Sequence, residues 1–463
     1  MLFTDTKHNQ RGLSKLLIIA LLGMIVATVG IVVWSLIIPP TPPPKKATVT
    51  IWGVFDDSSD FTKIINDYQA LHPYVTVNYV KMRLEEYEDA LVKGWATDSG
   101  PDIFAIPNSW VTQYSSTYIT PAPATTKVAY YTTKKVLFKT ETQITYQNEA
   151  TPSAKFIYDN YVNAAYQDVV LSGAVYALPL GIDTLALYYN RELLSQAHLV
   201  QPPTTWGEYA TVVSKITRVD EQGSIIRAGG ALGTFDNIPR AIDIITLLML
   251  QNGTTMASGK KVTFSQPLAS DPTYFPAVRA LQFYADFANP DKAAYTWNDK
   301  MPNAIDAFAA GQLVFFLGYQ YQQDDIRAKS RGIDFAVAGV PQVDPNTEVN
   351  YANYWVYTVA KKARNVPVAW NFLKFAADGA NVQSYLAATK QASVLRSILS
   401  TQLEDPDLGV FARQALTAQT WYRGRAPQAA DEYFTAMIKS VTGSKADITT
   451  ALTVAANQIQ AQY

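Results

Sequence analysis

Hydrophobic and polar residues follow one another along the chain in a pattern that predicts strands and helices in turn. Apolar residues alternate with polar ones over 47–54 and 75–82, as in half-buried strands. Between them, 57–73 begins with polar residues, continues with apolar residues at helical spacing and closes with a proline. A helix over 83–97 and a strand over 101–110 extend this order. The alternation favours a parallel sheet covered by helices on both faces, which is the α/β class.

The later sequence keeps the same alternation. Residues 121–170 mix threonine and tyrosine without a clear period, and we interpret them as a surface insertion. From about Asp405 onward the pattern is almost entirely helical. Between these segments, helices are predicted at 240–253, 276–289, 302–312 and 366–379, and strands at 313–319 and 333–341.

An uncharged apolar run precedes all of these elements. Leu16 to Ile38 form about 23 such residues, which at about 1.5 Å per residue exceed the roughly 30 Å hydrocarbon core of a bilayer. We predict one transmembrane anchor over 16–38. A cleaved signal peptide is the alternative, but its apolar region is usually shorter, and no small-residue cleavage pattern follows the run. Prolines dominate 39–46, so this stretch is predicted to be a stiff extended linker.

The orientation of the anchor follows from the lengths on its two sides. The flanking charges differ little, because Lys7, Arg11 and Lys15 precede the run and Lys45 and Lys46 follow it. We therefore expect the short segment 1–15 in the cytoplasm and the long remainder on the extracytoplasmic side. The protein is predicted to cross the cell membrane once.

The composition narrows the classes of function. A formal net charge of -1 and a pI near 6.3 offer no basic face, so nucleic acid is not expected as a partner. The absence of cysteine excludes disulfides, thiolate metal sites and a lipid-modified cysteine. The three histidines, His8, His72 and His198, make a catalytic triad or a histidine metal site hard to assemble. We therefore expect neither a metal nor another cofactor.

Two glycine-containing stretches only partly resemble nucleotide-binding loops. GTTMASGKK at 253–261 has one residue too many between its glycines, and Lys261 stands where a serine or threonine should coordinate magnesium. AGGALG at 228–233 lacks the dinucleotide-binding spacing and is typical of a turn. Neither stretch predicts a phosphate site.

Aromatic residues are the most abundant candidates for ligand contacts. They make up 12% of the chain, with 28 tyrosines and 9 tryptophans. Such rings stack on the apolar faces of sugars, while nearby carboxylates and amides bind the hydroxyls. The 39 acidic residues also leave open an anchored enzyme that acts on polysaccharide through a carboxylate pair, because the sequence does not give the distance between two carboxylates.

Several stretches, taken in order, resemble the landmarks of the extracellular solute-binding protein family 1, the maltose-binding-protein-like sugar-binding components of ABC importers. The likeness runs from about Thr48 to the C-terminus and is weakest over 121–170. The stretches are TVTIWGV, FTKIINDYQALHPYVTVNYV, GPDIFAIPNSW, VYALPLGIDTLALYYNRELL, PPTTWGEYA, AIDAFAAGQLVFFLGY, NYWVYTVAKKA and AWNFLKFAAD.

This resemblance implies a two-lobed periplasmic-binding-protein fold of type II, with the ligand between the lobes. The implied function is that a monomer captures a sugar or oligosaccharide by hinge closure and delivers it to the permease subunits of an ABC importer. The implied lobes are 47–182 plus 340–390 for lobe 1, and 187–334 plus 391–463 for lobe 2.

Asp183 is the first site residue that the resemblance implies. It lies in the middle of the apolar run YALPLGIDTLALYYN, which would be a crossover that leaves lobe 1 at Pro179 and enters lobe 2 near Leu187. Its carboxylate is then expected at the floor of the cleft, facing ligand or hinge. The alternative is that Asp183 caps a local turn or pairs with a lysine, because a buried acid must be satisfied.

The other candidates follow from their positions in the same motifs. Each tryptophan among them could instead pack in the core, and Asp56 could simply cap the helix that follows it. Arg425 is the alternative to Arg423 as a polar clamp. The candidates are Trp52, Asp56, Asn108, Trp110 and Trp355 in lobe 1, and Tyr319, Tyr321, Trp421, Tyr422 and Arg423 in lobe 2.

Overall fold

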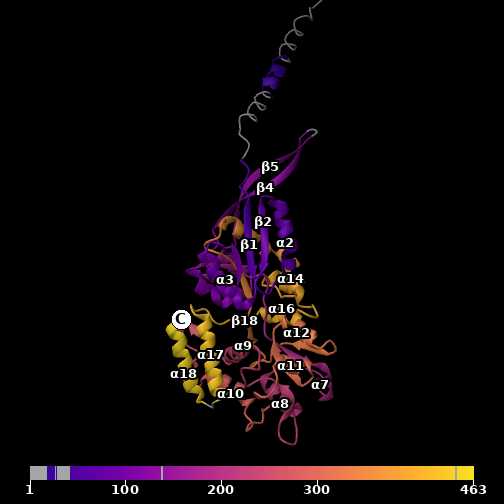
Figure 1. Cartoon of the computed structure of the whole chain (residues 1–463), viewed down its shortest axis with the longest axis vertical. Helices are drawn as coiled ribbons and strands as arrows, with labels where there is room; N and C mark the ends of the chain where they lie inside the picture. The colour runs from indigo at the N-terminus through magenta and orange to yellow at the C-terminus, as the bar shows by residue number, and fades with distance from the viewer. Residues whose placement is uncertain (1–17, 27, 29–41, 137–138, 444–445) are drawn as a thin grey trace, which may run out of the picture. The chain divides into compact units, whose positions relative to one another are not determined.

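The computed structural model describes residues 18–26, 28, 42–136, 139–443 and 446–463. The chain divides into two compact units (Figure 1). The first unit contains residues 1–45 and 129–146, and in it the Tyr146 hydroxyl donates to the Pro42 carbonyl at 3.2 Å. The second unit contains residues 46–128 and 147–463 and holds both large sheets.

The first large sheet of the second unit has the strand order β2-β1-β3-β17-β8. β1 pairs in parallel with β2 and β3, whereas β17 runs antiparallel to β3 and β8. Helices α2 and α13 pack on this sheet, and α14 packs on α2. The strands are β1 (Ala47–Gly53), β2 (Val75–Lys81), β3 (Ile103–Pro107), β17 (Trp355–Val359) and β8 (Ala177–Leu178), and the helices are α2 (Ser58–Leu71), α3 (Leu84–Ala96), α13 (Val366–Ala377) and α14 (Gly379–Thr389).

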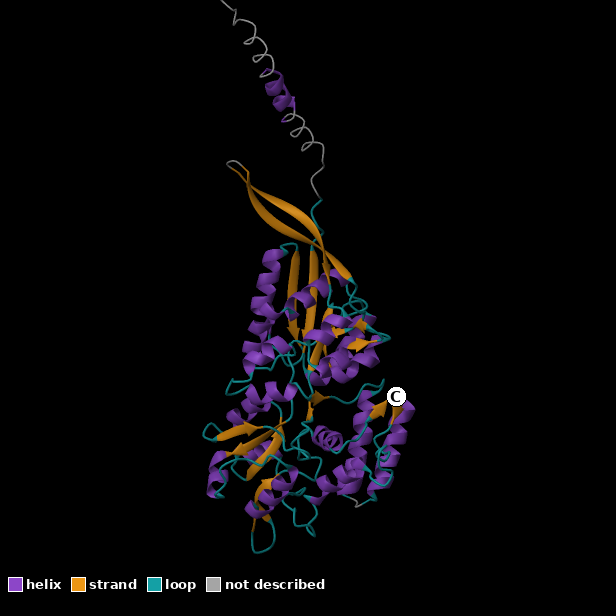
Figure 2. Cartoon of the chain, turned by 180° about the vertical axis from the view of Figure 1, so that it is seen from behind, coloured by secondary structure: helices purple, strands orange, loops and turns teal. Residues whose placement is uncertain are grey.

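The second large sheet has the order β10-β11-β14-β9-β15. Figure 2 shows in purple the helices that surround the orange strands of the second unit. Every residue of β14 is buried, since helices contact this strand and other strands pair with both of its edges. The strands are β10 (Arg218–Val219), β11 (Ile225–Gly230), β14 (Leu313–Gly318), β9 (Ala186–Asn190) and β15 (Phe335–Ala338), and the helices are α7 (Arg191–Gln196), α8 (Trp206–Ile216), α9 (Ala241–Gln251), α10 (Pro276–Asp286), α11 (Ala304–Ala309) and α12 (Gln322–Lys329).

The C-terminal helices pack on the second sheet's side, because α17 contacts α9 and α10, and α18 contacts α10 and α17. They are α15 (Arg396–Gln402), α16 (Gly409–Ala415), α17 (Pro427–Thr442) and α18 (Ile448–Gln462). The smaller elements are η1 (Asn108–Trp110), α4 (Val111–Ser115), β4 (Thr125–Val136), β5 (Lys139–Ala150), α5 (Ala154–Asn160), α6 (Asn163–Val169), β6 (Val170–Leu171), β7 (Ala174–Val175), β12 (Ala257–Ser258), β13 (Lys261–Val262), β16 (Asn350–Tyr351) and β18 (Ala418–Gln419).

Three connections pass between the two sheets, and they lie side by side. One joins β8 to β9, one joins β15 to β17, and one joins α14 to α15. Ile182 of the first connection forms an antiparallel bridge with Ala392 of the third, and Thr184 forms one with Ala352 of the second. Asp183 therefore lies between two bridged residues, where all three connections meet.

The predicted surface insertion needs correction. Within 121–170, β4 and β5 pair as a two-stranded sheet. Helix α6 buries four of its seven residues, so this part of the segment belongs to the core of the second unit and is not an insertion. The short helix shows too few turns for its period to be read, and the threonine-rich strands lack a continuous apolar face. The C-terminal quarter is also less helical than predicted, because β18 and an extended stretch occupy 418–426.

The predicted anchor lies mostly outside the described residues. Of 16–38, the structure describes 18–26 and 28, all of them as helix. In the described parts of the chain, no helix has both the length and the apolar character that a membrane crossing requires. The predicted cytoplasmic segment 1–15 and residues 39–41 of the predicted linker also lie outside the described residues, whereas 42–46 are described and form neither helix nor strand.

The carboxylate of Asp168 joins four separate parts of the second unit. Its side chain is 1% exposed. Its Oδ2 accepts from Asn108 Nδ2 at 2.8 Å and from the Tyr354 hydroxyl at 2.7 Å. Its Oδ1 accepts from Thr420 Oγ1 at 2.8 Å and from Arg423 Nε at 2.9 Å. Helix α6, the end of β3, the start of β17 and the stretch after β18 are thereby held together.

Asp168→Ala should destabilise the fold strongly. The substitution leaves one half-buried guanidinium and three buried polar groups without their acceptor, and loss of one partner of a buried ion pair costs up to roughly 3–5 kcal/mol. Urea unfolding should therefore show a clearly lower midpoint. Asp159→Ala removes an exposed carboxylate that pairs with Lys155, and it should leave the midpoint unchanged. Equal midpoints for Asp168→Ala and the wild type would contradict the role of Asp168.

Candidate functional site

The second unit contains a cavity of about 690 Å³ whose walls come from distant parts of the chain. One wall is the end of α9 together with the β12–β13 hairpin. A second wall is the stretch 419–425, and Thr112 of α4 and Tyr463 complete the lining. Threonine hydroxyls, a glutamine amide and cationic groups therefore face the same space as two aromatic rings. Such a mixture suits a polar ligand with an apolar face.

Trp421 and Tyr463 form the aromatic wall. Their ring centroids lie 6.1 Å apart at an interplanar angle of 19°. Phe264 meets the edge of Trp421 at 6.3 Å, and the Tyr351 hydroxyl donates to the Trp421 carbonyl at 2.6 Å. These contacts fix the indole, which stays half-buried at the cavity. Trp421 is thus a preformed stacking surface.

The two residues that follow Trp421 are also held firmly. Tyr422 is 3% exposed, and its hydroxyl accepts from the Ala426 amide at 3.3 Å. Arg423 donates to Asp168 and, through Nη2, to Thr420 Oγ1 at 2.6 Å. Arg423 lines the cavity, as does Arg425, whereas Tyr422 supports the wall from behind.

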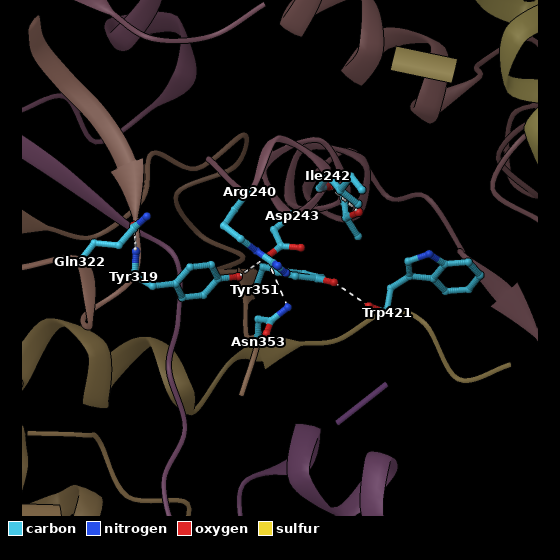
Figure 3. A network of polar contacts seen from close by, with 9 residues as sticks. Arg240, Ile242, Asp243, Tyr319, Gln322, Tyr351, Asn353 and Trp421 are labelled. Atoms are coloured by element: carbon cyan, nitrogen blue, oxygen red, sulfur yellow. Dashed lines mark hydrogen bonds and ion pairs between the residues drawn. The ribbon is translucent and has the colours of Figure 1, made fainter. Parts of the chain in front are cut away.

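Figure 3 shows a polar network around Asp243 and, beside it, the hydrogen bond from Tyr351 to the Trp421 backbone. Asp243 Oδ2 accepts from Arg240 Nε at 2.8 Å, from the Tyr319 hydroxyl at 2.7 Å and from Asn353 Nδ2 at 3.5 Å. Asp243 is 3% exposed, and its negative charge raises the pKa of Arg240. Arg240 has a φ of 61°, a left-handed backbone conformation that is unusual for a residue other than glycine.

Asp183 is held by backbone amides. Its Oδ1 accepts from the amides of Thr184 at 2.8 Å and Gln320 at 3.0 Å, and its Oδ2 accepts from the Tyr321 amide at 3.5 Å. Burial raises the pKa of Asp183 to about 7, although these hydrogen bonds oppose the shift. The contacts with the turn before α12 match the alternative in which Asp183 fixes a turn. Its contact with a ligand stays a prediction.

Tyr319 and Tyr321 differ in accessibility. Tyr319 is 1% exposed and is engaged by Asp243, whereas Tyr321 is 54% exposed. Their rings lie nearly parallel, with centroids 6.1 Å apart. Burial is the main cause that raises the pKa of Tyr321 to about 12. Of the two, only Tyr321 has the exposure that a stacking contact requires.

Asp56 is bound by tyrosines. Its carboxylate accepts from the hydroxyls of Tyr357 and Tyr385, and burial raises its pKa. The alternative that Asp56 caps α2 is wrong, because the capping box is formed by Asp57 and Asp60.

Trp52 and Trp355 are both half-buried. The Trp52 carbonyl accepts from the Tyr87 hydroxyl at 3.1 Å. Trp355 meets Phe55 edge to face at 5.2 Å and lies 6.1 Å from the Tyr87 ring. Phe55 is 60% exposed, so this aromatic group borders solvent.

Asn108 and Trp110 have different surroundings. Asn108 is 6% exposed and donates to Asp168, so its amide nitrogen is already engaged. Trp110 is half-buried and stacks on Tyr114, with centroids 5.4 Å apart. Neither residue lines the cavity.

The structure therefore brings Trp421, Arg423 and Arg425 together at one cavity. The remaining candidates lie outside its lining, and their ligand contacts stay predictions. Sequence reasoning missed Lys260 and Thr254, which line the cavity within the stretch judged only as a failed phosphate loop. It also missed Tyr463 and the Arg240–Asp243 pair, because nothing in their local sequence indicates a shared location.

No metal-binding group of three histidine or acidic residues occurs among the residues with described positions.

Comparison with known proteins agrees with this architecture. A family model described as "Bacterial extracellular solute-binding protein" matches residues 63–407. The cyclic alpha-maltosyl-1,6-maltose binding protein from Arthrobacter globiformis has 18% identity and a TM-score of 0.70, over 91% of this chain and 99% of that chain. The GacH receptor of Streptomyces glaucescens has 19% identity and a TM-score of 0.67, over 90% of this chain and 99% of that chain.

MalE from Xanthomonas citri, described as a sugar-binding protein, has 14% identity and a TM-score of 0.68, over 89% of this chain and 96% of that chain. At these identities the solved structures establish the fold, and the predicted two-lobed α/β architecture is confirmed. Because the family match extends over more than half of its length, the chain belongs to the bacterial extracellular solute-binding protein family.

Proposed function

We propose that this protein captures a sugar or oligosaccharide and delivers it unaltered to the permease of an ABC importer. The cavity beside the stacked Trp421 and Tyr463 carries the proposal. A sugar presents an apolar ring face together with hydroxyls, and this cavity offers an aromatic wall together with hydrogen-bonding side chains. Solved structures of similar fold support it, since they include complexes with acarbose and with maltotetraose.

Capture would proceed by closure of two lobes. We propose lobe 1 as 47–182 plus 340–390 and lobe 2 as 187–334 plus 391–463. Few chain segments connect the two sheets, and they run side by side at the Ile182–Ala392 and Thr184–Ala352 bridges. Rotation about such a narrow connection leaves both cores intact. With these bounds, the Glu88–Gln428 hydrogen bond at 3.3 Å and the contacts of Asp168 with Thr420 and Arg423 all join the two lobes, so opening would have to break them.

Asp183 is proposed to act at this hinge. Its carboxylate ties the first connection to the amides of Gln320 and Tyr321 at the end of β14. We infer that this contact aligns Tyr321, whose exposed ring is positioned beside the connection, for ligand contact. The rival role, direct binding of ligand hydroxyls by Asp183, gives a different result in the test below.

The enzyme alternative has less support from the geometry. Hydrolysis of a glycosidic bond requires two carboxyl groups beside the substrate. Among the described residues that line the cavity, none is aspartate or glutamate. The family match likewise supports binding without turnover.

The protein is proposed to be anchored by residues 16–38. The apolar run is long enough to cross a bilayer, and the family is described as extracellular. The binding unit would then stand on the extracytoplasmic side, where an importer receives its substrate.

Residues 47–463 should bind at least one member of a saccharide panel and leave it chemically unchanged. Thermal shift finds the ligand, because saturation at about 100 times Kd adds roughly 2.7 kcal/mol of stability. Trp421→Ala removes the main aromatic wall and should raise Kd about tenfold or more in calorimetry. Tyr158→Ala removes an exposed ring on α5 and should not change Kd. Cleavage products in mass spectra that increase with protein concentration would sink the proposal.

Asp183→Asn should change how stability depends on pH. Because the folded-state pKa is raised from 3.8 to about 7, the stability that Asp183 contributes is present below about pH 4 and is lost as the pH rises through 7. The amide of the variant does not ionise, so its contribution to stability does not change with pH. The free energy of unfolding of the variant should therefore rise by a few kcal/mol relative to that of the wild type between about pH 4 and 8, at about 1.4 kcal/mol per unit of pKa shift.

Chemical denaturation across this pH range measures the effect, with Asp325→Asn, an exposed acid on α12, as the control. Parallel profiles for Asp183→Asn and the wild type would refute the buried, proton-binding state. If the variant instead weakens ligand binding at constant stability, the carboxylate contacts ligand directly.

Deletion of residues 1–38 should move the protein from the membrane fraction to the soluble fraction. The full-length chain should remain in the membrane fraction after alkaline carbonate washing, since an apolar helix is removed only by detergent. Immunoblots of the fractions measure both results. Release of the full-length chain by carbonate alone would mean that 16–38 does not anchor it.

A further inference from the structure

We propose that the cavity selects an anionic saccharide, one that carries a carboxylate, sulfate or phosphate group. The inference rests on the proposed function and names the ligand class. Three basic residues, Lys260, Arg423 and Arg425, line the cavity, and its described lining includes no aspartate or glutamate. The Asp168 carboxylate balances Arg423 from behind, so two positive charges remain uncompensated.

A two-residue hairpin turn determines the position of Lys260. Ser258 pairs with Lys261 across β12 and β13, which leaves Gly259 and Lys260 as the turn. Gly259 has a φ of 58° at the first turn position, a conformation that favours glycine there. The turn therefore holds Lys260 at the cavity, while Lys261 starts β13 outside the lining.

Neither Lys260 nor Arg425 has an ion-pair partner among the described residues, and both are exposed. Several other cations of the second unit pair with acids, as in the Lys390–Asp324 contact at 3.4 Å. Within the described chain, no acidic side chain therefore offsets the charges of Lys260 and Arg425, which remain available to an anionic ligand.

Arg423 adds a rigid donor. Its Nε and Nη2 are held by Asp168 and Thr420, while its Nη1 has no hydrogen-bond partner within the described chain. A guanidinium held in this way loses little conformational entropy when it binds an anionic oxygen. It therefore favours a fixed geometry for the acidic group.

Thr254 supplies an independent sign of a missing ligand. The residue is 6% exposed and lines the cavity, yet its Oγ1 is buried without a hydrogen-bond partner in the described structure. A buried hydroxyl without a partner is costly, and rotation of the Thr254 side chain toward the cavity would let a ligand oxygen satisfy it. Thr254 lies in the same stretch as Lys260, so the unsatisfied hydroxyl and the unpaired cation belong to the same wall.

Together these features favour an acidic sugar over a neutral one. A neutral saccharide uses the aromatic wall and the hydroxyl groups but gains nothing from two uncompensated cations. An anionic group gains charge-assisted hydrogen bonds, which are about twice as strong as neutral ones. The aromatic wall at the same cavity places the sugar ring beside its charged substituent.

The test uses the full-length protein in detergent and matched pairs of saccharides on a glycan array, each neutral member beside its uronate, sulfate-ester and phosphate-ester forms. Calorimetry then measures Kd for the best pair. The acidic member should bind about tenfold or more tightly than its neutral match. The advantage should shrink when salt is raised to about 0.5 M, because exposed charges are screened. The three acidic forms show which anionic group the site accepts.

Lys260→Gln and Arg425→Gln should each reduce the preference for the acidic member, and the double variant should abolish it. Lys261→Gln is the matched control, since it removes the neighbouring charge outside the cavity and should leave the preference intact. Equal binding of neutral and acidic members, or an unchanged preference in the double variant, overturns the anionic ligand class but leaves the proposed function standing. Binding of no saccharide at all overturns the proposed function itself.

Discussion

A single buried carboxylate determines how one wall of the candidate site is assembled. Asp168 accepts hydrogen bonds from the end of β3, the start of β17 and the stretch after β18, so elements far apart in sequence share one charged group. Its burial is tolerated because every one of these contacts is present, including the ion pair with Arg423. Without this group, the loop that carries Trp421 and Arg423 would lose its fixed position relative to helix α6.

A second buried acid, Asp243, organises polar side chains near Tyr351, which itself contacts the loop. Asp243 collects Arg240, Tyr319 and Asn353, and Tyr351 beside them donates to the Trp421 backbone. The loop is therefore held by the Asp168 carboxylate and by the Tyr351 hydroxyl, while its aromatic and basic side chains face the cavity. Rigid support behind an accessible surface reduces the entropy lost when a ligand binds.

The regular part of the fold was predictable from sequence because its elements carry strong local signals. The alternation over 47–54 and 75–82 and the helical spacing between them correspond to β1, β2 and α2 within a few residues. Helix α6 was missed because seven residues show too little periodicity. The alternative in which Asp56 caps the helix missed the true cap, Asp57, by one residue, a distance that helix-start patterns do not resolve.

The site was harder to predict because tertiary contacts create it. Trp421 was identified through its motif, but Lys260 and Thr254 gain their meaning only when the β12–β13 hairpin folds against the stretch 419–425. The same holds for Asp183, whose partners Gln320 and Tyr321 are separated from it by more than 130 positions in the sequence. Local patterns carry no information about such pairings.

The three connections beside Asp183 also constrain how the molecule can move. The Ile182–Ala392 and Thr184–Ala352 bridges join the connections laterally, so no connection can slide along its neighbours without breaking backbone hydrogen bonds. Bending and twisting of the three together remain possible. Any relative motion of the two sheets is thereby reduced to very few degrees of freedom, and the proposed open and closed forms would share one register at these bridges.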